Sequence, residues 1–332
     1  MLAEARLPRN ELWVAGLLAG GLVLVVWRDA VYPVGSPAAW AGWVAYSVAI
    51  AGYVGMGLPW FRQWVGEGWR MVGLAATLSG VATCCASILG RVTVGGLLEA
   101  WAFLFGLVGL GFLCRRWRSV ERRFGWMDFM LLPLAALPVV FHLVPMWQVP
   151  PWPGTPVPPV GPAYIVLLLA VPLALGALLL TPRQPRLEFG WAVRGGDLLT
   201  ALALYGAFLL VGVPVGLWTG LAAHHPCPWD MWQGIGAFCS LFFFPAVLEE
   251  FFFRGICLNL MAERWGLGWA VLLSSLLFGL LHLRKPHPFA YAGLAVGAGA
   301  VYGAVYLRTG NLTAAALTHA LVDFTWLAWF GG

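Results

Sequence analysis

The chain has 332 residues, of which 61% are hydrophobic and only 10% are charged, and its formal net charge is +5. A soluble domain carries roughly 25% charged residues to cover its surface, so this composition excludes an ordinary soluble fold. Together with a mean hydropathy of +0.82, it predicts an integral membrane protein of the all-α class.

Apolar runs of about 18 residues or more are typical of helices that cross a membrane. The sequence contains eleven such segments, which predict a polytopic, multi-pass protein of the cell membrane that is embedded in membrane lipids. These segments are residues 12–27, 38–58, 70–90, 94–114, 127–147, 162–180, 197–221, 232–256, 267–283, 288–307 and 311–330.

The basic loop at residues 181–196 is the best candidate for a domain boundary. Residues 1–180 contain about six predicted helices with almost no charge inside them, and no motif indicates their role. Their many Gly and Ala residues suit close helix packing. This region therefore has three possible roles, as a scaffold, a substrate channel or a partner surface. Residues 197–330 carry the charged groups that lie within predicted spans.

The basic residues predict how the chain crosses the membrane. With a cytoplasmic N-terminus, most of them fall on the inner side, including the runs at residues 115–125 and 183–194. The positive-inside rule therefore favours a cytoplasmic N-terminus and an external C-terminus. Arginines beside membrane helices are the normal use of such charge, so we expect no nucleic-acid partner.

Two adjacent glutamates and an arginine interrupt the apolar segment 232–256. Each charge at the centre of a bilayer costs roughly 2.5–3.5 kcal/mol on insertion scales, so these groups must face one another or a watery cavity. Glu250 and Arg254 are four residues apart and share one helix face, which predicts an ion pair. Glu249 points about 100° away from this face, so it lies outside the predicted ion pair and its carboxylate is available for chemistry. In the alternative, all three form an ion network that serves packing alone.

A histidine, His282, closes the next apolar segment. Gly266 and Gly268 predict a turn before this segment, and Glu249 and His282 each lie about 16 residues from that turn. At 1.5 Å per residue the separation is roughly 24 Å on each side, so a helical hairpin would place both residues at the same depth. A packing histidine held by a hydrogen bond is the alternative interpretation of His282.

The last apolar segment carries His319 and Asp323, which are four residues apart and therefore lie on one helix face. Gly310 and Asn311 predict the turn that leads into it. A His/Asp pair at this spacing binds a metal or directs two polar groups towards one point. The pair is weak evidence alone. Two histidines and a free glutamate that converge in a lipid-embedded cavity are much stronger evidence of a functional site.

Such a set of side chains supports hydrolysis. Glu249 as general base, with His282 beside it, can hold and deprotonate a water molecule. His319, with Asp323, can donate to an oxyanion as a tetrahedral intermediate forms. We expect that no cofactor is required, and the alternative is zinc bound by His282 and His319.

The common motifs of other hydrolases are missing from the sequence. There is no G-x-S-x-G and no H-E-x-x-H pattern, so neither a serine nucleophile nor a zincin helix is supported. Ser274 and Ser275 precede His282 in the same apolar segment. We interpret both serines as packing residues, because small polar side chains suit contacts between membrane helices.

The order of these motifs resembles the CAAX prenyl protease type II family, also called the CPBP or Abi family of intramembrane proteases. That family carries the motifs EExxxR, FxxxH, and HxxxN or HxxxD. In this sequence they correspond to Glu249–Glu250 with Arg254, Phe278 with His282, and His319 with Asp323. The resemblance covers roughly residues 197–330, and the preceding helices lie beyond the usual core.

This resemblance implies an all-helical intramembrane endopeptidase. Its substrate would be a protein or peptide that is cleaved near a membrane-proximal C-terminus. The family implies that Glu249 and His282 activate water and that His319 and Asp323 stabilise the oxyanion, while Glu250, Arg254 and Phe278 are interpreted as supporting residues. Where Asp323 stands, an asparagine would donate a hydrogen bond directly, whereas an aspartate needs a proton or a nearby cation to do so.

Two other classes of function remain as alternatives. A transporter or channel would use buried acids and histidines to line a polar path, but the two halves show no inverted repeat. A non-catalytic member of the family would use the polar cluster for binding, as in bacteriocin self-immunity. The intact Glu249, His282 and His319 argue against that interpretation.

Overall fold

The computed structural model describes residues 51–57, 59–65, 70, 73, 76–77, 94–117, 129–132, 134, 190–283 and 287–330. Within these ranges the chain is all-helical, apart from one isolated parallel β-bridge between Gly190 and Asn311. The all-α class is therefore confirmed. Internal contacts divide the chain into two compact units, one of residues 26–186 and one that contains residues 187–332.

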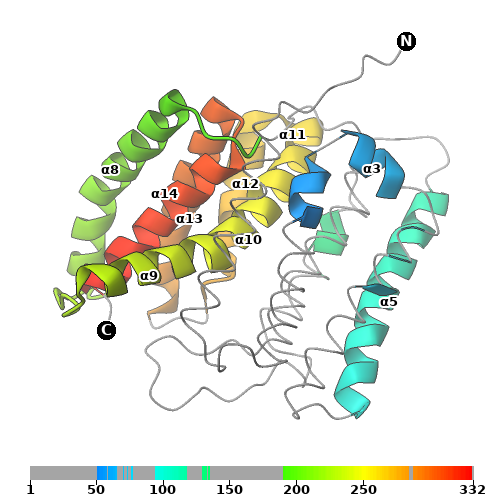
Figure 1. The fold of residues 1–332 in the computed structure, drawn as a ribbon, viewed down its shortest axis with the longest axis horizontal. Coiled ribbons are helices and arrows are strands. Elements are labelled where there is room, and N and C mark those ends of the chain that lie inside the picture. The colour runs from blue at the N-terminus through cyan, green and yellow to red at the C-terminus, as the bar shows by residue number, and fades with distance from the viewer. Residues whose placement is uncertain are drawn as a thin grey trace. The chain divides into compact units, whose positions relative to one another are not determined.

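The first unit includes α3 (Pro59–Val65) and α5 (Val94–Trp117) (Figure 1). Helix α5 confirms the segment predicted at 94–114, whereas α3 lies between two predicted segments. The buried Arg62 of α3 donates from Nη1 to the carbonyl of Met56 at 2.7 Å. The predicted segments at 12–27 and 162–180 lie outside the described residues, and those at 38–58, 70–90 and 127–147 are described only in part.

The second unit carries the motifs, and its helices follow the predicted segments closely. In chain order they are α8 (Gly195–Trp218), α9 (Met231–Leu241), the π-helical turn η2 (Phe242–Ala246), α10 (Val247–Glu250), the π-helical turn η3 (Phe251–Leu258), α11 (Asn259–Trp265), α12 (Leu267–Leu280), α13 (Pro288–Thr309), α14 (Leu312–Thr325) and the π-helical turn η4 (Trp326–Phe330). The main difference is that the helix predicted at 232–256 continues to Trp265.

The elements from α9 to α11 form one long rod, which Figure 1 shows in yellow-green to yellow. It begins with a capping box, in which Asp230 accepts from the backbone of Gln233 at 2.8 Å and Gln233 accepts in return at 3.0 Å. Pro245 lies inside η2, where it removes one backbone donor from the ladder. Glu249 and Glu250 occupy the short α10 between two π-helical turns, and such turns are frequent at functional sites.

Two glycines with positive φ separate the later helices. Gly266 has φ +81° and ends α11, which confirms the predicted turn at this residue. Gly268, however, lies inside α12, so its prediction as a turn residue was wrong. Gly310 has φ +64° and ends α13, and Asn311 then caps α14 by accepting from the backbone of Ala314 at 3.0 Å.

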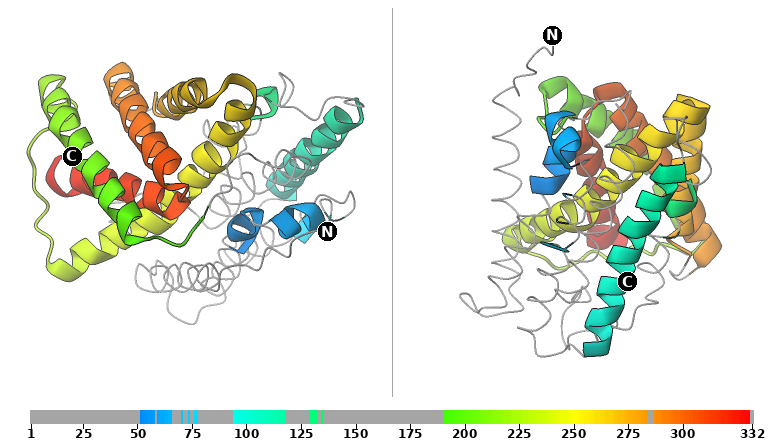
Figure 2. Two further views of the ribbon diagram at one scale, coloured as in Figure 1. Left: turned by 90° about the horizontal axis from the view of Figure 1, so that it is seen from above. Right: turned by 90° about the vertical axis from the view of Figure 1, so that its right-hand side faces the viewer.

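Helix α14 lies among the other helices of this unit and packs against α8, α9, η2, α10 and α13 (Figure 2). Helix α12 packs against α13, α11 and η3. Gly279 permits the close approach of α12 to α13, because an added Cβ would lie 2.7 Å from the carbonyl of Ala292 and closer still to Val296. This packing brings the residues of α10, α12 and α14 to one place.

Two described helices, α8 and α13, are long and apolar enough to cross a membrane. Helix α12 is apolar but shorter. Several large apolar side chains of α8 are exposed, including Leu199, Leu210 and Trp218, and lipid is a suitable environment for them. The total of about eleven spanning helices stays a prediction.

Two exposed residues on opposite sides of the predicted membrane allow the predicted topology to be tested. It places the turn between α11 and α12 in the cytoplasm and the beginning of α13 outside. Leu267 is 49% exposed and Phe289 is 85% exposed, and a cysteine at either avoids the positive φ of Gly266. We expect Leu267→Cys to react with an impermeant thiol reagent only after cells are opened, and Phe289→Cys to react on intact cells. The unsubstituted chain controls for its own cysteines, and the reverse pattern would overturn the topology.

Candidate active site

Glu250 and Arg254 form a fully buried ion pair in the long rod. Arg254 Nη1 donates to Glu250 Oε1 at 2.8 Å, and the exposed fraction of both side chains is 0%. This is the ion pair that the four-residue spacing predicts, so that prediction is confirmed. Burial removes both charges from water, so each group needs further partners to offset the lost hydration.

Arg254 finds those partners on other helices. Its Nη2 donates to the carbonyl of Gly299 in α13 at 2.5 Å. The guanidinium carbon lies 5.3 Å from the ring centroids of both Phe278 and Tyr302, a distance at which cation–π attraction acts. Gly299 permits this approach, because an added Cβ would lie 3.3 Å from Arg254 Nη2 and 3.2 Å from Ser275 Cα.

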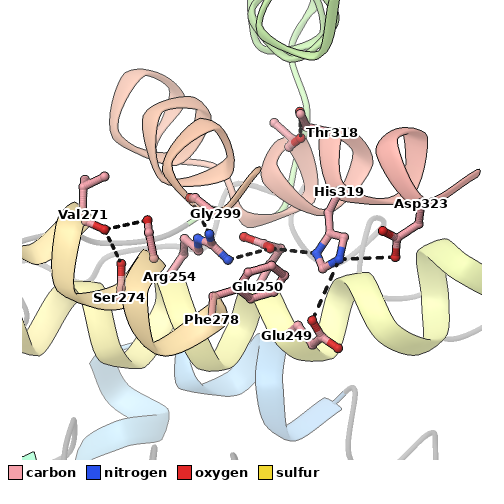
Figure 3. A network of polar contacts seen from close by, with 12 residues as sticks. Glu249, Glu250, Arg254, Val271, Ser274, Phe278, Gly299, Thr318, His319 and Asp323 are labelled. Atoms are coloured by element: carbon pink, nitrogen blue, oxygen red, sulfur yellow. Dashed lines mark hydrogen bonds and ion pairs between the residues drawn. The ribbon is translucent and has the colours of Figure 1, made fainter. Parts of the chain in front are cut away.

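Glu250 also holds His319 of α14, as Figure 3 shows. The distance between His319 Nδ1 and Glu250 Oε1 is 2.9 Å, and His319 is only 3% exposed. A carboxylate paired with arginine is ionised and can only accept, so Nδ1 carries the hydrogen. The imidazole stacks on Tyr302, with ring centroids 4.5 Å apart and an interplanar angle of 16°. The orientation of the ring is therefore fixed, and Nε2 faces away from Glu250.

Nε2 of His319 faces two further carboxylates. It lies 3.4 Å from Asp323 Oδ2 and 3.9 Å from Glu249 Oε2 (Figure 3). The side chains of Asp323 and Glu249 are 36% and 37% exposed, whereas Glu250 is fully buried. The two adjacent glutamates thus differ sharply: one is held in a buried ion pair, and the other lies at an accessible position beside the imidazole.

His282 lies just beyond the end of α12. Its Nδ1 is 2.8 Å from the carbonyl of Phe278, which can only accept, so Nδ1 carries the hydrogen and Nε2 keeps its lone pair. The ring stacks on Tyr291 of α13 at 5.6 Å. Within the described residues no hydrogen bond or ion pair joins His282 to Glu249. Both residues lie near His319, because Phe278 contacts both histidine rings and Glu249 Oε2 lies 3.9 Å from His319 Nε2.

The remaining motif residue, Phe278, packs between the histidines. Its ring centroid lies 4.7 Å from that of His282 and 5.5 Å from that of His319. Ser274 and Ser275 are buried on the same helix, and each donates to the carbonyl of Val271, at 3.2 Å and 2.6 Å. These contacts confirm the interpretation of both serines as packing residues.

Sequence reasoning missed three contributors, all of them on α13: Gly299, Tyr302 and Tyr291. One signal was present, because Gly299 and Gly303 form a G-x-x-x-G pattern in an apolar helix, which indicates a close helix contact. That pattern marks the helix face on which Arg254 docks. The stacking of Tyr302 on His319 and of Tyr291 on His282 has no counterpart in sequence spacing.

Residues 231–325 match the family model described as type II CAAX prenyl endopeptidase, Rce1-like. The match begins at α9, ends at α14 and includes every charged residue of the site. Residues 231–325 are therefore similar to this family of endopeptidases. No curated protein and no solved structure matches the chain. The Rce1-like family is one of proteases, so the chain is placed among the hydrolases, and the proteins of this family are membrane proteins.

No group of three His, Cys, Asp or Glu side chains suited to hold a metal ion occurs among the residues that the structure describes. The donors near His319 are committed to one another, since Nδ1 binds Glu250 and Nε2 faces Asp323 and Glu249. The independence from metal stays a prediction, to be decided by experiment.

The buried ion pair of this Rce1-like domain predicts a specific pattern of stability. Removing one partner of a buried pair typically costs about 3–5 kcal/mol. We therefore expect Glu250→Gln and Arg254→Leu to lower the melting temperature or the yield of purified protein. The double change Glu250→Leu with Arg254→Leu should recover part of the stability, because no charge is left unpaired.

The same double variant separates stability from activity. It also removes the carboxylate that binds His319, so we expect the recovered protein to remain inactive. Single variants with the melting temperature of the wild type would show that the pair is not structural. A double variant that recovers activity together with stability would show that His319 does not need Glu250.

Proposed function

We propose that the Rce1-like domain is an intramembrane endopeptidase. It hydrolyses a peptide bond near the membrane-proximal C-terminus of a protein or peptide substrate. The observation that carries this proposal is the contrast between Glu249, which is accessible and lies 3.9 Å from His319 Nε2, and Glu250, which is buried in an ion pair. A general base must reach a water molecule, and only one of the two glutamates can do so.

In the proposed mechanism, Glu249 takes a proton from water as the water oxygen attacks the scissile carbonyl. His282 holds this water through Nε2, the ring nitrogen that its bond to the Phe278 carbonyl leaves as an acceptor. No direct contact between Glu249 and His282 is needed, because a bridging water would occupy the space between them. Glu249 and His282 are thus the two residues that activate the water in this mechanism.

The carbonyl oxygen becomes negatively charged as the tetrahedral intermediate forms. His319 is placed to stabilise it from the Nε2 side, with Asp323 beside it. Its ring is held by Glu250 at Nδ1 and by the stacked Tyr302, so it does not need to reorganise during the reaction. Donors that are fixed in advance are the main source of such stabilisation.

The partners and the location follow from the same proposal. The substrate is a protein or peptide whose C-terminal segment lies close to the membrane, and membrane lipids surround the multi-pass chain in the cell membrane. Under the predicted topology, Glu249 and His282 open towards the outer half of the bilayer. A client that is processed on the outer side would suit this arrangement.

The variant Glu249→Gln tests the proposal most directly. It keeps the shape and hydrogen bonding of the side chain but removes the base, so we expect cleavage to be lost almost completely while folding and substrate binding remain. The assay is cleavage by a membrane fraction, read as peptides with shortened C-termini. Glu263→Gln, on the same rod but in α11, is the matched control and should retain activity.

Two histidine variants complete this test. His282→Ala should be as inactive as Glu249→Gln, because it removes the second group that holds the water. His319→Ala should lose roughly 10²–10³-fold in kcat, the usual cost of one oxyanion donor. Substantial turnover by Glu249→Gln would contradict the assignment of this site as a protease.

Activity in detergent is expected to survive a strong chelator, because a carboxylate rather than a metal activates the water in this mechanism. The measurement is the cleavage rate before and after chelation, followed by the addition of zinc. Activity that disappears with the chelator and returns with zinc would instead identify His282 and His319 as ligands. The Glu249→Gln variant, treated in parallel, gives the background rate.

A further inference from the structure

Asp323 Oδ2 lies 3.4 Å from His319 Nε2, closer than Glu249 Oε2 at 3.9 Å, and this contact suggests a role for Asp323 in proton transfer. We propose that Asp323 and His319 together hold one proton and deliver it to the leaving amine, so that Asp323 takes part in proton transfer rather than in oxyanion binding alone. This inference rests on the proposed protease function and adds a role for Asp323 within it.

Only one nitrogen of His319 is free to exchange protons with reacting groups. Arg254 keeps Glu250 ionised, and an ionised carboxylate accepts but does not donate. The hydrogen on Nδ1 is therefore committed to Glu250 Oε1 at 2.9 Å. Any proton that His319 exchanges with reacting groups must be on Nε2, on the accessible side of the ring.

Nε2 of His319 is in contact with Oδ2 of Asp323. The two atoms lie 3.4 Å apart. If His319 were neutral and Asp323 ionised, two lone pairs would face each other and the contact would be repulsive. The geometry is therefore favourable only if the pair holds a proton, either on Nε2 or on the carboxyl of Asp323. An asparagine at this position would donate through its own amide and would hold no such proton.

This proton has a defined place in the reaction. Glu249 removes a proton from water while the water oxygen bonds to the carbonyl carbon. When the C–N bond of the intermediate breaks, the electron pair goes to the nitrogen, which needs a proton to leave as an amine. The pair of His319 and Asp323 supplies it. Glu249 then returns its proton to Nε2, 3.9 Å away, so the net change is the addition of one water to one peptide bond.

The test compares an amide with an ester. The probes are a peptide that spans a cleavage site mapped in the membrane-fraction assay and its analogue with oxygen in place of the scissile N–H. An alkoxide depends much less than an amide nitrogen on a proton donor when it leaves. General acid catalysis contributes typically 10²–10⁴-fold, so we expect Asp323→Asn to lower kcat for the peptide by about 10²-fold or more and to leave ester cleavage within a few fold.

Three further variants make the result decisive. Asp323→Glu keeps an acid and should retain more peptide cleavage than Asp323→Asn, which also covers the case in which the asparagine variant folds poorly. Asn259→Leu removes buried hydrogen bonds from the same rod without touching His319, and its amide-to-ester ratio should equal that of the wild type. Glu249→Gln should cleave neither the peptide nor the ester. Cleavage of either substrate by this variant would refute the protease function itself.

Two outcomes would overturn the proposal for Asp323. If Asp323→Asn cleaves the peptide as fast as the wild type or faster, the residue serves only as an oxyanion donor, for which asparagine is sufficient. If the folded variant loses peptide and ester cleavage equally, Asp323 acts before the C–N bond breaks and does not protonate the leaving group.

Discussion

The buried pair of Glu250 and Arg254 is the interaction on which the rest of the site depends. Taking two charges out of water is costly, and their mutual attraction offsets the cost only when further partners are in place. Here those partners come from three helices: the Gly299 carbonyl and the Tyr302 ring from α13, the Phe278 ring from α12 and His319 from α14. The pair thus ties α12, α13 and α14 to the long rod at one point.

This arrangement also explains why the chain uses two glutamates in succession. Neighbouring residues on a helix point in directions about 100° apart, so they enter different environments. Glu250 turns into the helix bundle, where it is neutralised by Arg254 and orients His319. Glu249 turns to the accessible side, where no arginine forms an ion pair with it among the described residues. One carboxylate supplies rigidity, and the other remains available for chemistry.

Local sequence patterns predicted the parts of the fold that depend on local interactions. The four-residue spacing of Glu250 and Arg254 and the turn at Gly310 and Asn311 follow from helix geometry and from the conformational preferences of glycine and asparagine. The register of the long rod was less predictable, since η2 and η3 change its winding. Its continuation to Trp265 was missed because Glu263 and Arg264 end the apolar run without ending the helix.

Contacts between distant segments could not be predicted in the same way. Glu250 and His319 are far apart in the sequence, and their hydrogen bond depends on how α14 packs against α10. Nothing in the spacing of either motif indicates that the buried Glu250, rather than the accessible Glu249, makes the shorter contact with the imidazole. The stacked Tyr302 was missed for the same reason, because its position follows from the docking of α13.

The bridge between Gly190 and Asn311 joins the start of α14 to a segment far earlier in the chain. Thr313 donates to the carbonyl of Trp191 at 2.7 Å, and Asn311 donates to that of Ala192 at 2.6 Å. The start of α14 is therefore anchored by a segment that lies well before residue 231, where the family match begins. The region that is similar to the family and the region that holds α14 in place thus begin at different residues. A shortened chain that starts at the family boundary would keep every motif residue and still lose the anchor that holds the helix carrying His319 and Asp323.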